Sequence, residues 1–226
     1  MDFAGDRVTD LDGVKAALAS GARVLLMVRH AERPKMDNDD PTFGLTLPLT
    51  AAGCAMSRTF GEMLREYAAE TQFLSSPLLR TRLTAYHIAL GMGIRNPVIP
   101  ADPVLGNGTP YFADQHTVFE LFRDGSFFEK IFAYFATGRQ QGFNELREAT
   151  DRLEDWCART FTGRLGIFTT HDLYDGAFLH ARGAVKKFTR ENWTRFLDSA
   201  AIIFRPDGTR AYALVRAGLT DGIVGV

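Results

Sequence analysis

The sequence predicts an α/β protein: a three-layer α/β/α fold with a mainly parallel central sheet and an inserted helical cap. A short, continuously apolar run at residues 24–28 has the length and composition of a strand that is buried on both faces. Further strand patterns alternate with helical patterns along the chain, which is typical of a parallel sheet covered by helices. Residues 103–161 interrupt this alternation with a Gly- and Pro-containing loop followed by aromatic-rich helical segments.

The predicted elements follow one another in a regular order. We expect a first helix over residues 10–19 that ends at Gly21, and a second over residues 51–67 with Thr50 as its N-cap. The other predicted elements are strands at residues 72–75 and 164–169 and helices at residues 78–90 and 172–181. Two late strands at residues 200–205 and 210–215 flank a Pro-Asp-Gly turn, so we expect an antiparallel hairpin at a sheet edge.

The chain length is consistent with one core. We interpret residues 1–226 as a single domain, with a helical cap, residues 103–161, inserted within it. Most aromatic side chains of that stretch are expected to form the cap's own core. Tyr111 and Phe112, near the loop, are candidates for lining a substrate pocket.

Composition excludes some classes of partner. Hydrophobic residues make up 46% of the chain and charged residues 23%, and the formal net charge is −1, so no overall basic field would attract nucleic acid or an acidic membrane. No apolar run has the length of a membrane span, and the first residues, MDFAGDRVTD, contain no secretory leader pattern. We expect a cytoplasmic protein; the sequence leaves open its oligomeric state and whether a leader once preceded this chain.

A metal centre is not expected. Cys54 and Cys157 are far apart and have no metal-ligand spacing, and neither do the histidines at positions 87, 116 and 180. Phosphoryl transfer to a histidine, the chemistry that the polar residues described next suggest, needs no metal and no organic cofactor.

Polar side chains follow three of the predicted strands, at the edge where ligands bind in open α/β sheets. The first strand end supplies Arg29, His30 and Arg33, the second leads into a helix that begins near Arg80, and the third supplies His171 and Asp172. Phosphoryl transfer to nitrogen requires a nucleophile, cations for the phosphoryl oxygens and a proton donor for the leaving oxygen. These three strand ends together contain all of those groups, which predicts a site for a small phosphorylated substrate.

Four motifs carry a resemblance to a known family. Arg29-His30-Ala31-Glu32 resembles the RHGE signature of the histidine phosphatase (phosphoglycerate mutase-like) superfamily, and Leu49-Thr50-Ala51-Ala52-Gly53 resembles its LTxxG helix start. The segment from Ser76 to Ala85 resembles its SPLxRTxxTA segment, and His171 matches its late histidine. The motifs occur in the family's order and span most of the chain outside the predicted cap.

The resemblance implies a role for each matching residue. His30 would be phosphorylated transiently, while Arg29, Arg80 and His171 would hold the phosphoryl oxygens. Arg33 occupies the place of an additional phosphate-binding arginine in the acid-phosphatase branch (RHxxR), although Pro34 lies one position early. Ala31 replaces the family glycine, which removes no functional group.

The sequence offers three candidates for the general acid. Asp172 matches the HD pair of the acid-phosphatase branch, whose aspartate is the acid, and it also suits a helix N-cap. The other branch takes its acid from a glutamate after the third strand, and the corresponding residues 104–107 contain no carboxylate. We therefore favour Asp172, with Asp114 and Glu32 as alternatives.

The resemblance implies a phosphomonoester hydrolase that acts through a phosphohistidine intermediate on a small phosphorylated metabolite. A phosphoglycerate-type mutase ranks lower because the family's mutases use the missing glutamate. A non-catalytic module that binds a phosphorylated ligand is the third hypothesis, and the presence of both histidines argues against it.

Overall fold

The computed structural model describes residues 6–220, except residues 37–39, 41, 43, 107 and 124. One mixed sheet contains six strands in the order β1-β6-β5-β2-β4-β3. Three of its five strand pairings are parallel, which confirms the predicted mainly parallel sheet. The strands are β1 (Val8–Asp10), β2 (Arg23–Arg29), β3 (Thr71–Ser75), β4 (Leu165–Thr170), β5 (Ser199–Phe204) and β6 (Arg210–Arg216).

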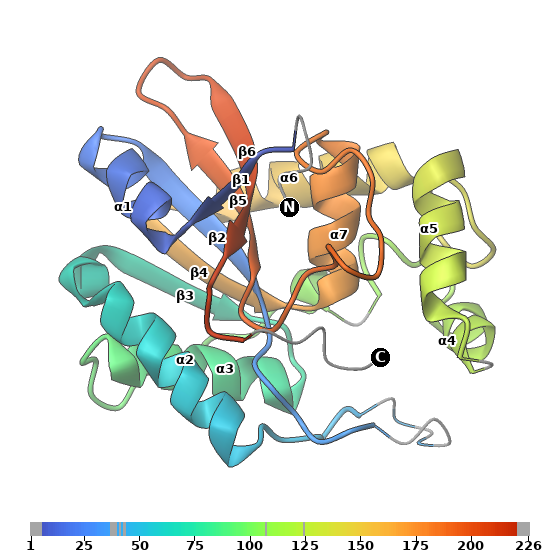
Figure 1. Cartoon of the computed structure of the whole chain (residues 1–226), viewed down its shortest axis with the longest axis horizontal. Helices are drawn as coiled ribbons and strands as arrows, with labels where there is room; N and C mark the ends of the chain where they lie inside the picture. The colour runs from blue at the N-terminus through green and yellow to red at the C-terminus, as the bar shows by residue number, and fades with distance from the viewer. Residues whose placement is uncertain are drawn as a thin grey trace.

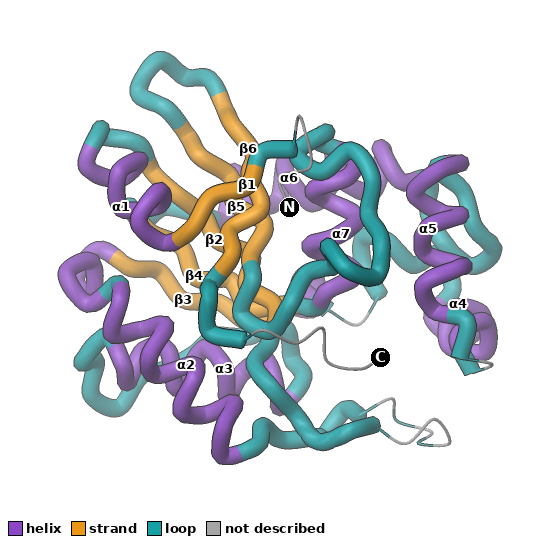
Figure 2. Tube along the Cα trace, viewed as in Figure 1, coloured by secondary structure: helices purple, strands orange, loops and turns teal. Residues whose placement is uncertain are grey.

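Helices lie on both sides of the sheet and complete the predicted three layers (Figures 1 and 2). One apolar cluster joins one face of the sheet to α1, α2 and α3, and a second joins the other face to α6, α7 and, beyond them, α4 and α5. The helices are α1 (Leu11–Ala19), α2 (Ala51–Met63), α3 (Leu79–Gly91), α4 (Gln115–Phe122), α5 (Phe127–Thr137), α6 (Leu146–Thr160) and α7 (Asp172–Ala181), with short 3₁₀ helices η1 (Arg65–Glu70) and η2 (Pro103–Leu105).

Strand β2 lies inside the sheet, between β5 and β4, and is apolar along most of its length. Successive side chains of a strand point to opposite faces, so Leu25 and Met27 join one cluster while Val24, Leu26 and Val28 join the other. All five are fully buried. This two-sided burial is the physical reason for the continuous apolar run at residues 24–28.

The register of the parallel strands brings the polar strand ends together. Arg29 at the end of β2 pairs with Thr170 of β4, and Ser75 at the end of β3 pairs with Thr169. The residues that follow therefore leave the sheet side by side, with the His30 and Ser76 amides donating to carbonyls of β4 at 3.0 Å each.

Helix α2 begins at the predicted N-cap and packs on the backbone just after His30. The Thr50 hydroxyl accepts a hydrogen bond from the Gly53 amide at 2.9 Å. A Cβ at Gly53 would lie 2.2 Å from the carbonyl oxygen of Glu32, so only glycine permits this approach. The predicted helix over residues 51–67 ends earlier than expected, at Met63, and continues as the tighter η1.

The predicted antiparallel hairpin is present, but the prediction that it lies at an edge of the sheet was wrong. Strands β5 and β6 do pair antiparallel, but β5 also pairs with β2. The far side of β6 is covered by β1, a three-residue strand that the sequence did not predict. A strand this short has too few residues to display an alternating pattern, and its partner lies some 200 positions away in the chain.

Residues 103–161 have two structural parts. Helices α4 and α5 project to one side of the molecule, where Figure 1 shows them beyond α7. Helix α6 instead lies in the helical layer next to α7, and its residues Leu153 and Cys157 share an apolar cluster with Phe168 of β4. We propose that the cap of this domain consists of η2, α4 and α5, and that α6 serves as a layer helix.

Candidate active site

A cavity of about 570 Å³ opens at the carboxyl ends of β2 and β4. The sequence-predicted residues that line it are Arg29, His30, Arg33, Arg80, His171 and Asp172. Their elements are far apart in the chain, and the parallel register described above brings them to one place. The structure therefore gathers into one cavity six residues that the sequence singled out.

His30 is fixed in a single tautomer. Its side chain is 4% exposed, and Nδ1 lies 2.9 Å from the carbonyl oxygen of Ala31. A carbonyl only accepts, so Nδ1 carries the proton and Nε2 keeps its lone pair. Burial lowers the pKa of His30 well below its usual range, and the positive charges of Arg80 and Arg29 lower it further. His30 is therefore neutral, with Nε2 available as a nucleophile.

His171 lies edge-on to His30, with 5.6 Å between the ring centroids. Its Nδ1 faces a guanidinium nitrogen of Arg80 at 3.5 Å, and its Nε2 lies 3.1 Å from the hydroxyl of Ser76. Because a guanidinium only donates, Nε2 carries the proton and donates it to Ser76. Burial, followed by the charge of Arg80, lowers the pKa of His171 well below its usual range.

Ser76 and Thr81 anchor His171 from behind and were not assigned a role from the sequence. The Ser76 hydroxyl lies 2.7 Å from that of Thr81, which in turn donates to the Leu78 carbonyl at 2.7 Å. A Cβ at Gly106 would lie 2.6 Å from the Ser76 side chain and 3.1 Å from Nε2 of His171. Residues 104–107, which carry no carboxylate, therefore include a glycine whose backbone packs closely against His171 and Ser76.

Three guanidinium groups make the cavity positively charged. Arg29 and Arg80 are 2% and 8% exposed, Arg33 is half-buried, and the buried Nε of each has no hydrogen-bond partner among the described residues. Burial and the charge of Arg33 lower the pKa of Arg80 to about 10, and burial lowers the pKa of Arg33 as well. Cations that are buried together near one carboxylate favour a bound anion, and arginine suits the oxygens of a phosphoryl group.

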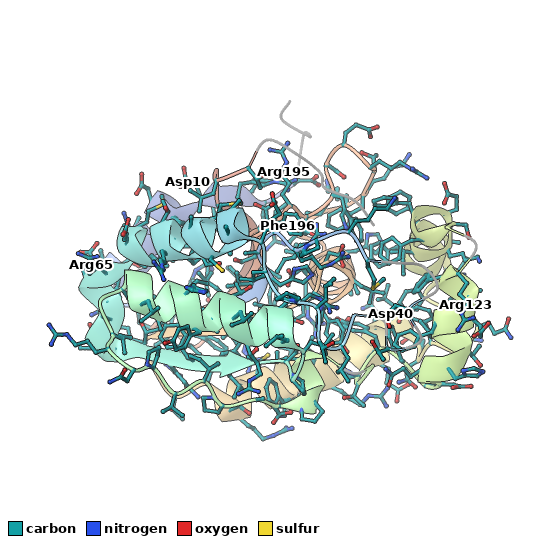
Figure 3. All side chains as sticks on the ribbon, turned by 90° about the horizontal axis from the view of Figure 1, so that it is seen from below. Asp10, Asp40, Arg65, Arg123, Arg195 and Phe196 are labelled. Atoms are coloured by element: carbon teal, nitrogen blue, oxygen red, sulfur yellow. The ribbon has the colours of Figure 1, made fainter. Side chains whose placement is uncertain are left out.

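The loop before β5 supports Arg29. The guanidinium of Arg29 donates to the Thr194 carbonyl and lies over the ring of Phe196, 4.7 Å from its centroid. Phe196 also contacts His30 at a centroid distance of 5.7 Å, and Figure 3 shows it near the middle of the molecule. Leu197 adopts a left-handed φ of 65°, a strained conformation that reverses the chain beside the site.

Asp172 begins α7 and is tied to three groups. Its Oδ2 lies 3.1 Å from Arg29 and accepts from the indole of Trp193 at 3.3 Å, while Oδ1 accepts from the Leu173 amide at 2.9 Å. Among the described residues that line the cavity, it is the one carboxylate. Asp172 could therefore donate a proton to a leaving oxygen, or it could simply orient Arg29.

The two alternative acids lie elsewhere. Glu32 accepts a hydrogen bond from the Thr50 hydroxyl at 2.7 Å, and exposed Asp114 caps α4 by accepting from Thr117. Neither lines the cavity, and neither does Tyr111, which is fully buried and bonded to Thr150. Phe112, the other pocket candidate from the sequence, does line it.

A second carboxyl, which the sequence did not reveal, lies beneath the site. Asp175 is fully buried on α7, and no side chain of the described residues donates a hydrogen bond to its oxygens. Burial, followed by the negative charge of Asp172, raises its pKa well above the usual range. A raised folded-state pKa gives stability that is fully present below the unfolded pKa and is lost as pH rises through the folded value.

Replacing Asp175 by Asn should therefore change how stability depends on pH. As pH rises from 4 to 8, we expect the free energy of unfolding of Asp175→Asn to increase relative to that of the wild type, by about 1 kcal/mol at pH 8. The reason is that a buried, unpaired carboxylate destabilises the folded wild type. Urea unfolding at several pH values measures this difference, with the exposed Asp114→Asn as control. Parallel stability curves for the wild type and Asp175→Asn would contradict it.

The two cavity histidines should titrate abnormally. NMR of histidine ring nitrogens at pH 6 should find His30 and His171 neutral, His30 protonated at Nδ1 and His171 at Nε2, whereas the protein unfolded in urea should titrate near 6.5. Since both folded pKa values are depressed, their contribution to stability is present above about pH 6.5 and is lost as pH falls. Inorganic phosphate should shift both titrations upward, because a dianion favours the charged ring. Normal titration of both rings in the free protein would refute this electrostatic description.

Comparison with known proteins adds independent information. The family model of the histidine phosphatase superfamily (branch 1) matches residues 25–103, a range that includes His30 and Arg80. No curated protein sequence matches the chain. Solved structures share the fold at low sequence identity.

Three of these structures align with this chain over nearly all of their own length. A mycobacterial glucosyl-3-phosphoglycerate phosphatase has a TM-score of 0.57 and 16% identity, covering 85% of this chain and 97% of its own. A phosphoglycerate mutase from Bacillus anthracis str. Sterne has a TM-score of 0.54 and 15% identity, covering 88% and 94%. A phosphoserine phosphatase from Entamoeba histolytica, in complex with 3-phosphoglyceric acid, has a TM-score of 0.54 and 16% identity, covering 87% and 98%.

The fold is thus the α/β fold shared with phosphoglycerate mutase-like proteins, with a polar strand edge suited to a phosphoryl group. Over residues 25–103 the chain matches the histidine phosphatase superfamily model. The matching model is that of branch 1 and stops before His171 and Asp172. The acid-phosphatase features at Arg33 and Asp172 stay predictions.

Proposed function

We propose that this protein is a phosphomonoester hydrolase that uses His30 as its nucleophile. The observation that supports this most is the state of His30, which is neutral, buried and held by Nδ1 in a cavity lined by three arginines. A neutral imidazole with a free Nε2 can attack phosphorus, and the guanidiniums can stabilise the charge on the phosphoryl oxygens. Two of the structural neighbours are phosphatases of small phosphorylated compounds, which supports the same reaction class.

The reaction would proceed in two steps. In the first, Nε2 of His30 forms a bond to phosphorus as the P–O ester bond breaks, and Asp172 gives a proton to the leaving alcohol. In the second, water attacks the phosphohistidine, the P–N bond breaks, and the resulting carboxylate of Asp172 takes a proton from that water. Arg29, Arg33, Arg80 and His171 would bind the phosphoryl oxygens in both steps, which is the role that the resemblance assigns to each.

The remaining expectations belong to this proposal. We expect a small phosphorylated substrate, no resident cofactor or metal, no nucleic-acid or membrane partner and a cytoplasmic location. Within the part of the chain that the structure describes, no helix is both long and apolar enough to cross a membrane. Among the same residues, no group of three or more His, Cys, Asp or Glu side chains is placed to hold a metal ion.

A panel of phosphate monoesters tests the proposal. Purified protein should release inorganic phosphate from several of them without added metal, in the presence of a chelator. Isomerisation of phosphoglycerate with bisphosphoglycerate present would indicate the mutase instead, and tight phosphate binding without turnover of any monoester would indicate a non-catalytic module. The lack of a carboxylate at residues 104–107, where the resemblance places the acid of the family's mutases, favours the hydrolase.

A further inference from the structure

The cavity continues beyond the phosphoryl site to the projecting helices. Its volume of about 570 Å³ is in the range of sites that bury a drug-sized ligand, about 300–1,000 Å³, and is more than a phosphoryl group requires. The described residues of α4, α5 and the loop before α4 supply a wall of five phenylalanines. They are Phe112, Phe119, Phe122, Phe127 and Phe128.

The rings of this phenylalanine wall are held by one another. Phe112 lies edge-on to Phe119 with centroids 6.4 Å apart, and Phe127 contacts Phe122 and Phe128 at 5.0 and 5.4 Å. Phe127 also contacts the buried Trp193, at 6.0 Å, which connects the wall to the loop beside Asp172. Rings packed in this way are ordered before a ligand arrives, which lowers the entropic cost of binding.

Few polar groups accompany these rings. Arg123 and Arg190 line the cavity, but each is exposed and paired with a carboxylate, Glu120 and Glu129 respectively. Figure 3 places Arg123 at the outer end of the molecule, away from Phe196 at the centre. Thr42 and Gln115 also line the cavity, but the five rings themselves offer no hydrogen-bond partner. An alcohol rich in hydroxyl groups would therefore lose more hydrogen bonds to water against this wall than it regains.

We propose that the preferred substrate is a phosphate monoester whose alcohol carries a large, apolar, aromatic group. The phosphoryl group would bind between Arg29, Arg80 and His171, and the ring would pack against Phe119 and its neighbours in the phenylalanine wall. This inference rests on the proposed function and narrows it, since it disfavours sugar phosphates and phosphoglycerate. Aromatic pairs prefer the offset or edge-on packing that this wall offers.

Substrates that differ only in the alcohol's apolar group test the inference. Naphthylethyl phosphate, ethyl phosphate and glycerol 3-phosphate all release a primary alcohol, so differences in their kcat/KM report binding rather than the leaving group. We expect kcat/KM for naphthylethyl phosphate to exceed the other two by about 100-fold, as burial of an aromatic group predicts. Inhibition constants of the matching phosphonates should show a preference in the same direction without any turnover.

A pair of phenylalanine variants locates the preference. Phe119→Ala should lower the ratio of kcat/KM for naphthylethyl over ethyl phosphate about tenfold, or ~1.4 kcal/mol. Phe204→Ala is the matched control, because Phe204 is a half-buried phenylalanine of β5 that packs on Phe161 and does not line the cavity, and it should leave the ratio unchanged.

The possible outcomes separate this inference from the proposed function. Hydrolysis of all three substrates at similar kcat/KM, or an equal effect of both variants on the ratio, would overturn the aromatic preference while leaving the hydrolase intact. No hydrolysis of any monoester, together with phosphonates that bind preferentially when aromatic, would overturn the hydrolase and keep the aromatic site.

Discussion

His30→Ala should reduce turnover of every phosphate monoester by about 10⁶-fold, the size of loss that follows removal of a nucleophile. The side chain supplies the lone pair that forms the covalent intermediate, and no other described residue of the cavity presents a neutral imidazole nitrogen free of a partner. Binding of inorganic phosphate should survive in part, because Arg29, Arg33 and Arg80 remain.

Trapping the intermediate distinguishes loss of the nucleophile from a damaged fold. Wild-type protein mixed with a labelled substrate should carry acid-labile, alkali-stable label, as expected for phosphohistidine, and His30→Ala should carry none. His87→Ala is the control, because His87 lies on the surface of α3 beside Arg58, outside the cavity. Full activity in His30→Ala would overturn the proposed mechanism.

Asp172→Asn should slow hydrolysis of alkyl phosphates by about 10²–10⁴-fold, the usual contribution of general acid catalysis. An alkyl phosphate leaves as a basic alkoxide that must be protonated in the transition state, whereas nitrophenyl phosphate leaves as a stabilised phenolate. The loss with nitrophenyl phosphate should therefore be much smaller. The amide keeps an oxygen that can accept from the Leu173 amide, so the start of α7 is preserved.

The comparison of the two substrate types also tests whether Asp172 only positions a neighbouring group. The contact of Oδ2 with Arg29 at 3.1 Å provides the competing explanation, that Asp172 only orients a phosphate-binding arginine. Equal losses on alkyl and nitrophenyl substrates would favour that positioning role, and Asp114→Asn, at a carboxylate that does not line the cavity, should change neither.

The sequence was most informative about features that depend on residues close together in the chain. The apolar run of β2 is long enough to identify a doubly buried strand, and the residue at its end is automatically at the sheet edge. The same reasoning placed Arg80 and His171 next to His30, because parallel strands bring their carboxyl ends together. Thr50 was recognisable as an N-cap because capping depends on a hydroxyl within three residues of the amide it satisfies.

Tertiary structure alone decided the features that depend on non-local packing. The sheet order, with β5 beside β2 and β1 at the edge, depends on pairings that no local pattern encodes. Whether Asp175 lies in water or in the core, and whether Phe119 faces a cavity or another ring, is determined by which elements pack against α7 and α4. The sequence by itself therefore identified the proposed reacting groups and the edge at which they meet. The three-dimensional packing determined their protonation states and the shape of the space for the substrate, because burial and neighbouring charges arise only when distant segments come together.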